Sequence, residues 1–381
     1  MSKNRLEQSA RICLYILACM LPVWFVPHPL GIEFWREITF TTLVAAAAIL
    51  WLLSILSSGE IQYSHSPLWY GLGVVAAVFG IATFTSRAPF VSLFLADATA
   101  ERFSTLIVGV LLMGVMAGVM RRGRQAKLLL AILFFSGAAA ALLTALQLVA
   151  DISLLRYFGL ASARAANVIG THNGLAVFYA ALLMIGIGLI VGGEMRPRWL
   201  QGALLSGSAL FLFDLLGVNF VSSWIAILGS AVFLFGVFLI EDKIVRRSRG
   251  LGWRQGAALG LVVLSAVMLL TPGPLITQLP DEISPSPRAT VSVAVSVFKE
   301  GVVRTLFGSG PGMFGLDWAR YSGITLRQPG LAAIRFDQGH SWAATLLSTV
   351  GVAGLAAFVG FLALTLFIFL RMFLMGADGR G

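Results

Sequence analysis

The chain has 381 residues, of which 58% are hydrophobic and only 12% are charged, and its net charge is +10. This composition excludes an ordinary soluble globular domain and predicts a polytopic membrane protein whose main partner is the lipid bilayer. The two cysteines, Cys13 and Cys19, both lie in the first apolar segment, so the sequence supports neither a disulfide framework nor a thiolate metal site.

A short basic N-terminus precedes the first apolar run. Residues 1–5 read Met-Ser-Lys-Asn-Arg, a beginning that is also typical of secretory signal peptides. The run ends at residues 21–27 in Leu-Pro-Val-Trp-Phe-Val-Pro, which offers no small-residue cleavage site. We therefore expect a first helix that is retained.

Ten apolar runs follow one another along the chain. Most have about 17 to 25 residues, the length that crosses roughly 30 Å of hydrocarbon. The predicted fold class is therefore an all-α polytopic membrane protein with about ten transmembrane helices. The predicted spans are Ala10–Val26, Ile38–Leu56, Pro67–Phe84, Phe103–Met120, Leu128–Ala150, Asn173–Val191, Leu200–Leu216, Val221–Ile240, Gly256–Leu270 and Ser341–Leu370.

Three short links between these spans are rich in lysine and arginine. The positive-inside rule places such links in the cytoplasm, and strict alternation then places both termini there as well. The links are 121–127, 196–198 and 243–249. This topology predicts three parts: nine transmembrane helices in 1–270, a long extracytoplasmic loop with short helices in 271–340, and a tenth helix with a cytoplasmic tail in 341–381.

Ten arginines fall on the predicted outer face, where topology alone would deplete basic residues. Their planar forks bind phosphate or carboxylate bidentately, so an anionic ligand would explain them. Pairing with lipid phosphates, or with outer acids such as Glu300, explains them equally well. They are Arg36, Arg87, Arg102, Arg156, Arg164, Arg288, Arg304, Arg320, Arg327 and Arg335.

The long outer loop contains a stretch, 289–306, whose pattern is compatible with a strand or a helix. We favour a helix that lies along the bilayer surface with Arg288 at its start, because its apolar residues share one helical face. These residues are Val291, Val295, Phe298, Val302 and Leu306. The following 308–314, Gly-Ser-Gly-Pro-Gly-Met-Phe, lacks the Gly-Lys-Ser/Thr ending of a P-loop. It predicts a tight turn whose glycines also allow backbone to approach a ligand closely.

His340 directly precedes an apolar run of about 30 residues, or roughly 45 Å of helix, which exceeds the hydrocarbon thickness. The excess must tilt, protrude outward, or break at Gly351 or Gly354. Each option sets His340 at the mouth of an outward cavity, where a neutral imidazole could accept a proton from a hydroxyl. A histidine that merely caps the helix fits the same pattern. No two of the four histidines have metal-ligand spacing, so no metal site is predicted.

Asp214 stands alone in the outer half of an apolar span. A carboxylate inside a membrane is costly and often functional. Pairing with an arginine and hydrogen bonding near the interface are both compatible with this position, so Asp214 is kept as a possible site residue.

The order of these motifs resembles the bacterial O-antigen ligase and polymerase family. Residues 170–176, Gly-Thr-His-Asn-Gly-Leu-Ala, open a span; Arg288 precedes the glycine-rich stretch 308–314; and His340 precedes 346–355, Leu-Leu-Ser-Thr-Val-Gly-Val-Ala-Gly-Leu. The resemblance covers about half of the chain. It implies a glycosyltransferase of the bacterial inner membrane that takes an undecaprenyl-diphosphate-linked glycan as donor and needs no nucleotide, cofactor or metal.

The resemblance also implies roles for individual residues. Arg288 would bind the diphosphate, His340 would act as base toward the acceptor hydroxyl, and Gly310 and Gly312 would shape the turn. Asn173 matches a family position of unclear role. We add Arg164 and Arg102 as diphosphate-binding candidates because each lies in an outer loop close to a span.

This chain also departs from the family pattern. The family's Ser-Arg pair before a tryptophan is replaced at 219–224 by Asn-Phe-Val-Ser-Ser-Trp, and Ser341 follows the histidine in place of asparagine. Three hypotheses therefore stand: glycan transfer to a lipid A core, a growing polysaccharide (as by an O-antigen or exopolysaccharide polymerase) or a protein; a transporter or flippase of an anionic lipid-linked glycan; and a non-catalytic subunit of a polysaccharide complex. No nucleic-acid partner is predicted.

Overall fold

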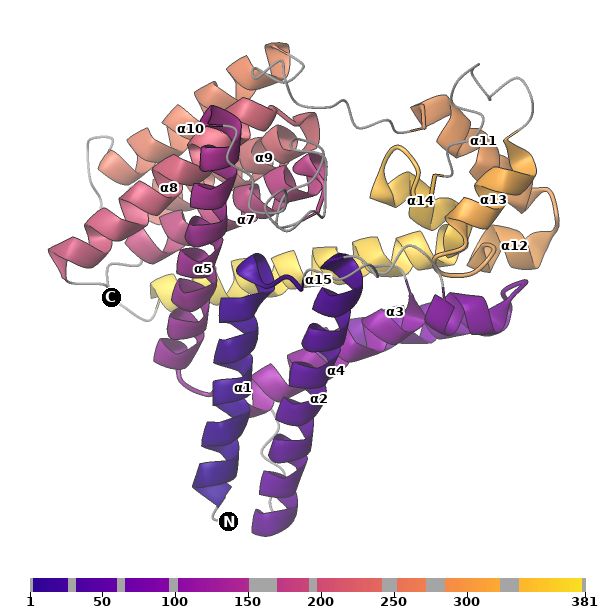
Figure 1. The fold of residues 1–381 in the computed structure, drawn as a ribbon, viewed down its shortest axis with the longest axis horizontal. Coiled ribbons are helices and arrows are strands. Elements are labelled where there is room, and N and C mark those ends of the chain that lie inside the picture. Colours follow the sequence, from indigo (N-terminus) through magenta and orange to yellow (C-terminus); the bar gives the residue numbers. More distant parts are fainter. Residues whose placement is uncertain are drawn as a thin grey trace. The chain divides into compact units, whose positions relative to one another are not determined.

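The computed structural model describes residues 3–26, 32–59, 66–95, 102–150, 170–191, 197–241, 252–271, 285–322 and 336–378. Every regular element in these ranges is helical, which confirms the all-α fold class (Figure 1). The elements are α1 (Lys3–Val23), α2 (Ile32–Ser58), α3 (Leu68–Phe84), η1 (Val91–Leu95), α4 (Phe103–Val119), α5 (Gly123–Ala150), α7 (His172–Val191), α8 (Arg198–Val218), α9 (Val221–Ile240), α10 (Trp253–Leu270), α11 (Pro287–Phe298), α12 (Val302–Phe307), α13 (Phe314–Tyr321), α14 (Trp342–Thr349) and α15 (Gly351–Asp378).

Eight of these helices are long and apolar enough to cross a membrane: α1, α2, α5, α7, α8, α9, α10 and α15. The chain is therefore a multi-pass membrane protein. Two further predicted spans form the apolar helices α3 and α4, which have 17 residues each and are about 25 Å long at 1.5 Å per residue. The count of ten crossings and the cytoplasmic placement of the termini stay predictions.

By packing, the chain forms two compact units, each built from two separate stretches of sequence. Unit 1 comprises Met1–Ile61 and Gly118–Glu282, and unit 2 comprises Gln62–Ala117 and Ile283–Gly381. The C-terminal helix α15 thus belongs with α3 and with the short helices of the long loop. The predicted division of the chain into 1–270, 271–340 and 341–381 was based on membrane topology and not on packing, and it stays a prediction.

In unit 1, α5 packs against α1, α7 and α8, and α9 packs against α7 and α10. The core is aromatic at its centre, where the ring of Phe211 lies 5.2 Å from the rings of both Phe134 and Tyr179. A Cβ on Gly207 would lie 2.7 Å from the Phe134 ring. Small residues therefore allow these helices to approach closely, as is common in membrane bundles.

In unit 2, α3 packs along α15, and α12 packs against both. Their shared core contains Phe79 from α3, Leu346 from α14 and Val350, all almost fully buried. Helix α11 packs against α13 and α14. The short helices of the long loop are thus held on the apolar helices of the same unit.

The predicted span Ser341–Leu370 forms two helices, α14 and α15. The break falls at Gly351, whose φ of 71° is left-handed and whose position leaves no room for a Cβ beside the carbonyl of Leu306. The long apolar run could tilt, protrude outward, or break at Gly351 or Gly354, and in the structure it breaks at Gly351. A non-glycine residue there would be strained.

The stretch 289–306 is helical as predicted, but it forms two helices rather than one. Helix α11 ends at Phe298, and α12 begins after Gly301, whose φ is 138°. The predicted apolar face is largely exposed, with Val291, Val295 and Val302 exposed to 50%, 43% and 75%. The opposite face of α11 is buried in the protein, which leaves the apolar face available to the bilayer.

Candidate functional site

The glycine-rich loop 308–312 caps the end of α14. The backbone N–H of Ser309 donates to the carbonyl of Ser348 at 2.9 Å, and the N–H of Gly310 donates to the carbonyl of Thr349 at 2.8 Å. Carbonyls in the last turn of a helix have no partner within the helix, so the loop satisfies them. These two N–H groups are therefore used within the protein.

The same loop is tied to the segment that follows α3. Ser92 Oγ donates to the carbonyl of Pro311 at 2.7 Å, and a Cβ on Gly310 would overlap Ser86. Gly310 and Gly312 have φ values of 125° and 70°, a region that favours glycine. Gly310 and Gly312, the residues predicted to shape the turn, thus both have a positive φ. Gly310 also allows the backbone to approach Ser86 closely.

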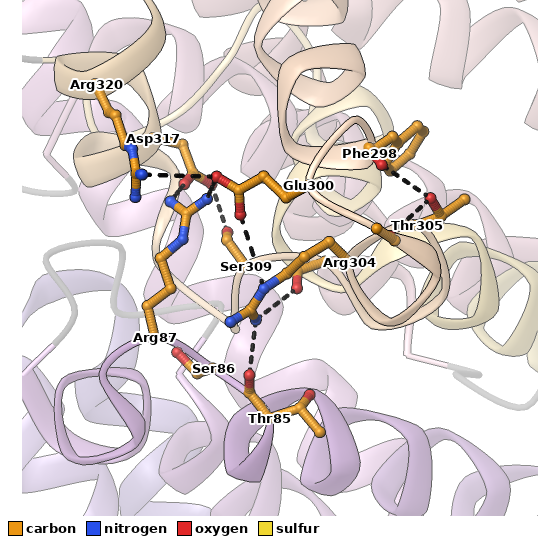
Figure 2. A network of polar contacts seen from close by, with 12 residues as sticks. Thr85, Ser86, Arg87, Phe298, Glu300, Arg304, Thr305, Ser309, Asp317 and Arg320 are labelled. Atoms are coloured by element: carbon orange, nitrogen blue, oxygen red, sulfur yellow. Dashed lines mark hydrogen bonds and ion pairs between the residues drawn. The ribbon is translucent and has the colours of Figure 1, made fainter.

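Arg87, in the turn after α3, joins three parts of unit 2 (Figure 2). Its Nη1 donates to Asp317 Oδ1 at 3.1 Å, its Nη2 donates to the Tyr321 hydroxyl at 2.7 Å, and it pairs with Glu300. Asp317 is fully buried and also accepts a hydrogen bond from Ser309 Oγ. Arg87 therefore connects α13, the turn between α11 and α12, and the glycine-rich loop.

Glu300 is the point on which three guanidinium groups converge. Besides Arg87, Arg304 Nε and Arg320 Nη2 each lie 3.9 Å from a Glu300 carboxylate oxygen, and the Tyr321 hydroxyl donates to the same carboxylate. Figure 2 shows the side chains of Arg87, Arg304 and Arg320 pointing toward Glu300. We call these residues, together with Asp317, the arginine cluster.

The cluster shifts the pKa values of its two acids in opposite directions. The hydrogen bond from Arg87 lowers the pKa of Glu300 to about 2. Burial raises the pKa of Asp317 to about 6, although Ser309 and Arg87 oppose this rise. The hydrogen bond with Glu300 raises the pKa of Arg87, so this arginine is charged at any physiological pH.

His340 lies immediately before α14, with its side chain exposed. Its backbone N–H donates to Thr290 Oγ1 at 2.9 Å, and the N–H of Gly339 donates to Thr345 Oγ1 at 3.0 Å. Ser341 caps the helix by accepting from the N–H of Ala344 at 3.3 Å. The backbone around the histidine is thus held while its imidazole faces outward.

Arg288 is brought to the same place. It is an exposed residue in the first turn of α11, after Pro287 and the capping residue Ser286, whose hydroxyl accepts from the N–H of Ala289 at 3.2 Å. Thr290, which binds the backbone of His340, follows two positions later. Within the part of the chain that the structure describes, neither the guanidinium nor the imidazole makes a hydrogen bond or ion pair.

The other predicted site residues are placed differently. Arg102 lies half-buried just before α4 and belongs to unit 2, as Arg288 and His340 do. Asn173, the second residue of α7, belongs to unit 1. Arg164 lies outside the described residues.

Asp214 is fully buried on α8 in unit 1. Neither of its carboxylate oxygens is hydrogen bonded within the described ranges, and the same holds for Trp224 Nε1 and Ser208 Oγ. Neither arrangement expected for Asp214, an arginine pair or an interfacial hydrogen bond, is therefore seen among these residues. No group of three His, Cys, Asp or Glu residues in the described ranges could hold a metal ion.

The central role of Arg87 was not predicted, because it was only counted among the outer arginines. Two signals pointed to it. Arg87 lies three residues after the end of an apolar span, and Asp317 is an isolated acid in an otherwise apolar stretch of the long loop. Neither signal indicates that Arg87 and Asp317, which are 230 positions apart, form a pair.

Comparisons of this chain with protein-family models, curated proteins and solved structures give no match. The resemblance to O-antigen ligases and polymerases thus stays a prediction that rests on motif order.

Proposed function

We propose that this chain is a membrane glycosyltransferase that transfers a glycan from an undecaprenyl-diphosphate-linked donor to an acceptor hydroxyl on the outer face of the bacterial inner membrane. The observation that carries the proposal is the hydrogen bond between Thr290 and the backbone of His340. It joins the beginning of α11, which carries Arg288, to the beginning of α14, which follows His340. An exposed cation and an exposed imidazole therefore share one region of the long loop.

These two side chains have the chemistry that glycan transfer from a diphosphate requires. The imidazole of His340 would accept the proton of the attacking hydroxyl. The guanidinium of Arg288 would bind the diphosphate and stabilise the charge that develops as it departs. The positive ends of α11 and α14 add to this preference for an anion. A single displacement of this kind inverts the anomeric carbon.

The acceptor is a lipid A core in a ligase, or the next repeat unit in an O-antigen or exopolysaccharide polymerase. The resemblance supports both, and the described residues favour neither. The bilayer would deliver the lipid-linked donor sideways to unit 2.

The roles of the two residues are separable in experiment. Purified wild type, His340→Ala, Arg288→Ala and the control Lys299→Ala, which removes another exposed cation of the same loop, are given the lipid-linked donor with and without acceptor. We expect His340→Ala to retain donor binding and to lose at least about a hundredfold in turnover, the usual contribution of a general base. Arg288→Ala should weaken donor binding, and Lys299→Ala should do neither. An equal loss of donor binding and turnover in all three variants would contradict these roles for His340 and Arg288.

Asp214 favours a second candidate function, a transporter or flippase of a lipid-linked anionic glycan. A fully buried carboxyl in a membrane helix, without a hydrogen bond among the described residues, is typical of transport pathways. Movement of lipid-linked sugar across proteoliposome membranes would then be lost in Asp214→Asn and unchanged in His340→Ala. The transferase proposal instead requires that glycan transfer be lost in His340→Ala and retained in Asp214→Asn.

A further inference from the structure

The arginine cluster carries more positive than negative charge. Arg87, Arg304 and Arg320 contribute three positive charges, whereas Glu300 and the buried Asp317 contribute two negative charges. Among the residues that the structure describes, one further negative group is therefore needed to neutralise the cluster.

Some donors of the cluster lack a hydrogen-bond acceptor among the residues that the structure describes. Arg320 Nη2 is 3.9 Å from Glu300, which is an ion-pair distance but too long for a hydrogen bond. The Arg320 side chain is 59% exposed, and its guanidinium lies 5.6 Å from the centre of the Tyr321 ring. Arg304 makes hydrogen bonds through Nη1 to the carbonyls of Thr85 and Gly308. Within the described part of the chain, its Nε makes only a long ion pair. A ligand with several acceptor oxygens would complete these contacts.

Exposed apolar side chains flank the cluster along the chain. Arg87 lies between Phe84 and Phe90, which are 79% and 64% exposed, and Arg304 follows Val302 and Val303, which are 75% and 53% exposed. The helix that carries Arg304, α12, packs against α3 and against α15, which is long enough to span the bilayer. Guanidinium groups beside exposed apolar residues at the end of membrane helices are suited to the headgroup level of a bilayer, where lipid phosphates lie.

We propose that Arg87, Arg304 and Arg320 bind the phosphate group of a membrane lipid, and that Glu300 occupies the phosphate position when no lipid is bound. A phosphate offers more acceptor oxygens than one carboxylate and matches the planar forks of several arginines at once. Glu300 lies in the turn between α11 and α12, next to Gly301, where a Cβ would meet no atom within 4 Å. The open space beside Gly301 leaves room for this turn to move during the exchange. The proposal does not depend on the transferase activity.

The test measures binding of short-chain phosphatidic acid to the detergent-purified full chain. Diacylglycerol with the same acyl chains is the control ligand without a phosphate. Inorganic phosphate, added as a competitor, is the control ligand without acyl chains. Arg320→Ala is the main variant because this side chain is mostly exposed and the fold should tolerate its loss. We expect about tenfold weaker binding, the size of one lost charge-assisted hydrogen bond, while Lys299→Ala should bind as the wild type does.

Glu300→Gln gives the sharper result, because a neutral amide no longer competes with the phosphate. We expect it to bind phosphatidic acid several-fold more tightly than the wild type does. Unchanged or weaker binding by a folded Glu300→Gln protein would overturn the exchange. Equal binding of diacylglycerol would exclude a phosphate site, and inorganic phosphate that binds as tightly as the lipid would exclude the lipid as occupant. If Glu300→Gln does not fold, unchanged binding by Arg320→Ala overturns the proposal by itself.

Discussion

At the residue scale, the best-defined interaction in the long loop is the pair between Arg87 and Asp317. The carboxylate is fully buried, whereas 20% of the Arg87 side chain is exposed. Removing one partner of such a pair leaves an uncompensated charge in a low-dielectric environment. This pair should therefore matter more for the stability of unit 2 than the exposed contacts of the cluster do.

The first prediction is that Arg87→Ala lowers the stability of unit 2 by about 3 kcal/mol, the range measured for breaking buried pairs. Arg320→Ala, which removes a mostly exposed contact with the same cluster, should cost less than about 1 kcal/mol. Thermal unfolding of the detergent-purified variants gives the comparison. Equal destabilisation by the two variants would mean that the buried pair does not hold the loop.

The second prediction concerns pH. The pKa of Glu300 is lowered to about 2 from 4.5, so its contribution to stability is present above pH 4.5 and is lost as the pH falls toward 2. The pKa of Asp317 is raised to about 6 from 3.8, so the folded state binds this proton more tightly than the unfolded state, and stability falls as the pH rises from 3.8 through 6. Stability should therefore be highest between these two transitions.

Asp317→Asn separates the two effects. Its thermal unfolding temperature should vary less between pH 4 and 6.5 than that of the wild type, while the loss below pH 4.5 should remain. If the wild type shows no decrease between pH 4 and 6.5, or if Asp317→Asn shows the same decrease, Asp317 does not titrate in the way that its burial indicates.

At the residue scale, sequence patterns identified the motifs but not their partners. Arg288 and His340 stood out through their places relative to apolar runs, and the structure brings them to adjoining helix starts. The contact that connects their segments involves Thr290, an ordinary helix residue in the sequence. The Arg87 pair was not predicted, because no local pattern relates residues that meet only in the fold.

At the element scale, the break between α14 and α15 shows what a sequence leaves open. Tilting, protruding and breaking were all compatible with a long apolar run. The outcome depends on Leu306 and Gly308, which come from a distant part of the chain and pack against Gly351. The sequence offered two glycines, Gly351 and Gly354, as possible positions for the break. Tertiary contacts determine that it falls at Gly351.

The third prediction tests this break. Gly351→Ala introduces a Cβ at a φ of 71° and against the Leu306 carbonyl, so it should destabilise unit 2 by about 1 to 2 kcal/mol or more. Gly360→Ala is the matched control on the same helix, because a Cβ there meets nothing within 4 Å and alanine favours a helix by about 1 kcal/mol over glycine. Thermal unfolding should therefore separate the two. Similar effects would indicate a continuous helix through Gly351.

At the scale of the whole molecule, hydropathy predicted the fold class and the approximate positions of the apolar helices, because a continuous apolar run inside a bilayer satisfies its own backbone groups by forming a helix. It could not predict the two compact units, each of which joins an early stretch of the chain to a late one. Hydropathy is a local property, whereas these units depend on which helix faces fit together.

The central claim is that the exposed His340, next to the helix that carries Arg288, serves glycan transfer. The most direct test is release of undecaprenyl diphosphate from a lipid-linked glycan by the purified full chain in nanodiscs, with and without acceptor. We predict release by the wild type that requires the acceptor and that disappears in His340→Ala. Release that is unchanged in His340→Ala, or a wild type that never consumes the donor with any lipid A core or glycan acceptor, would contradict the claim.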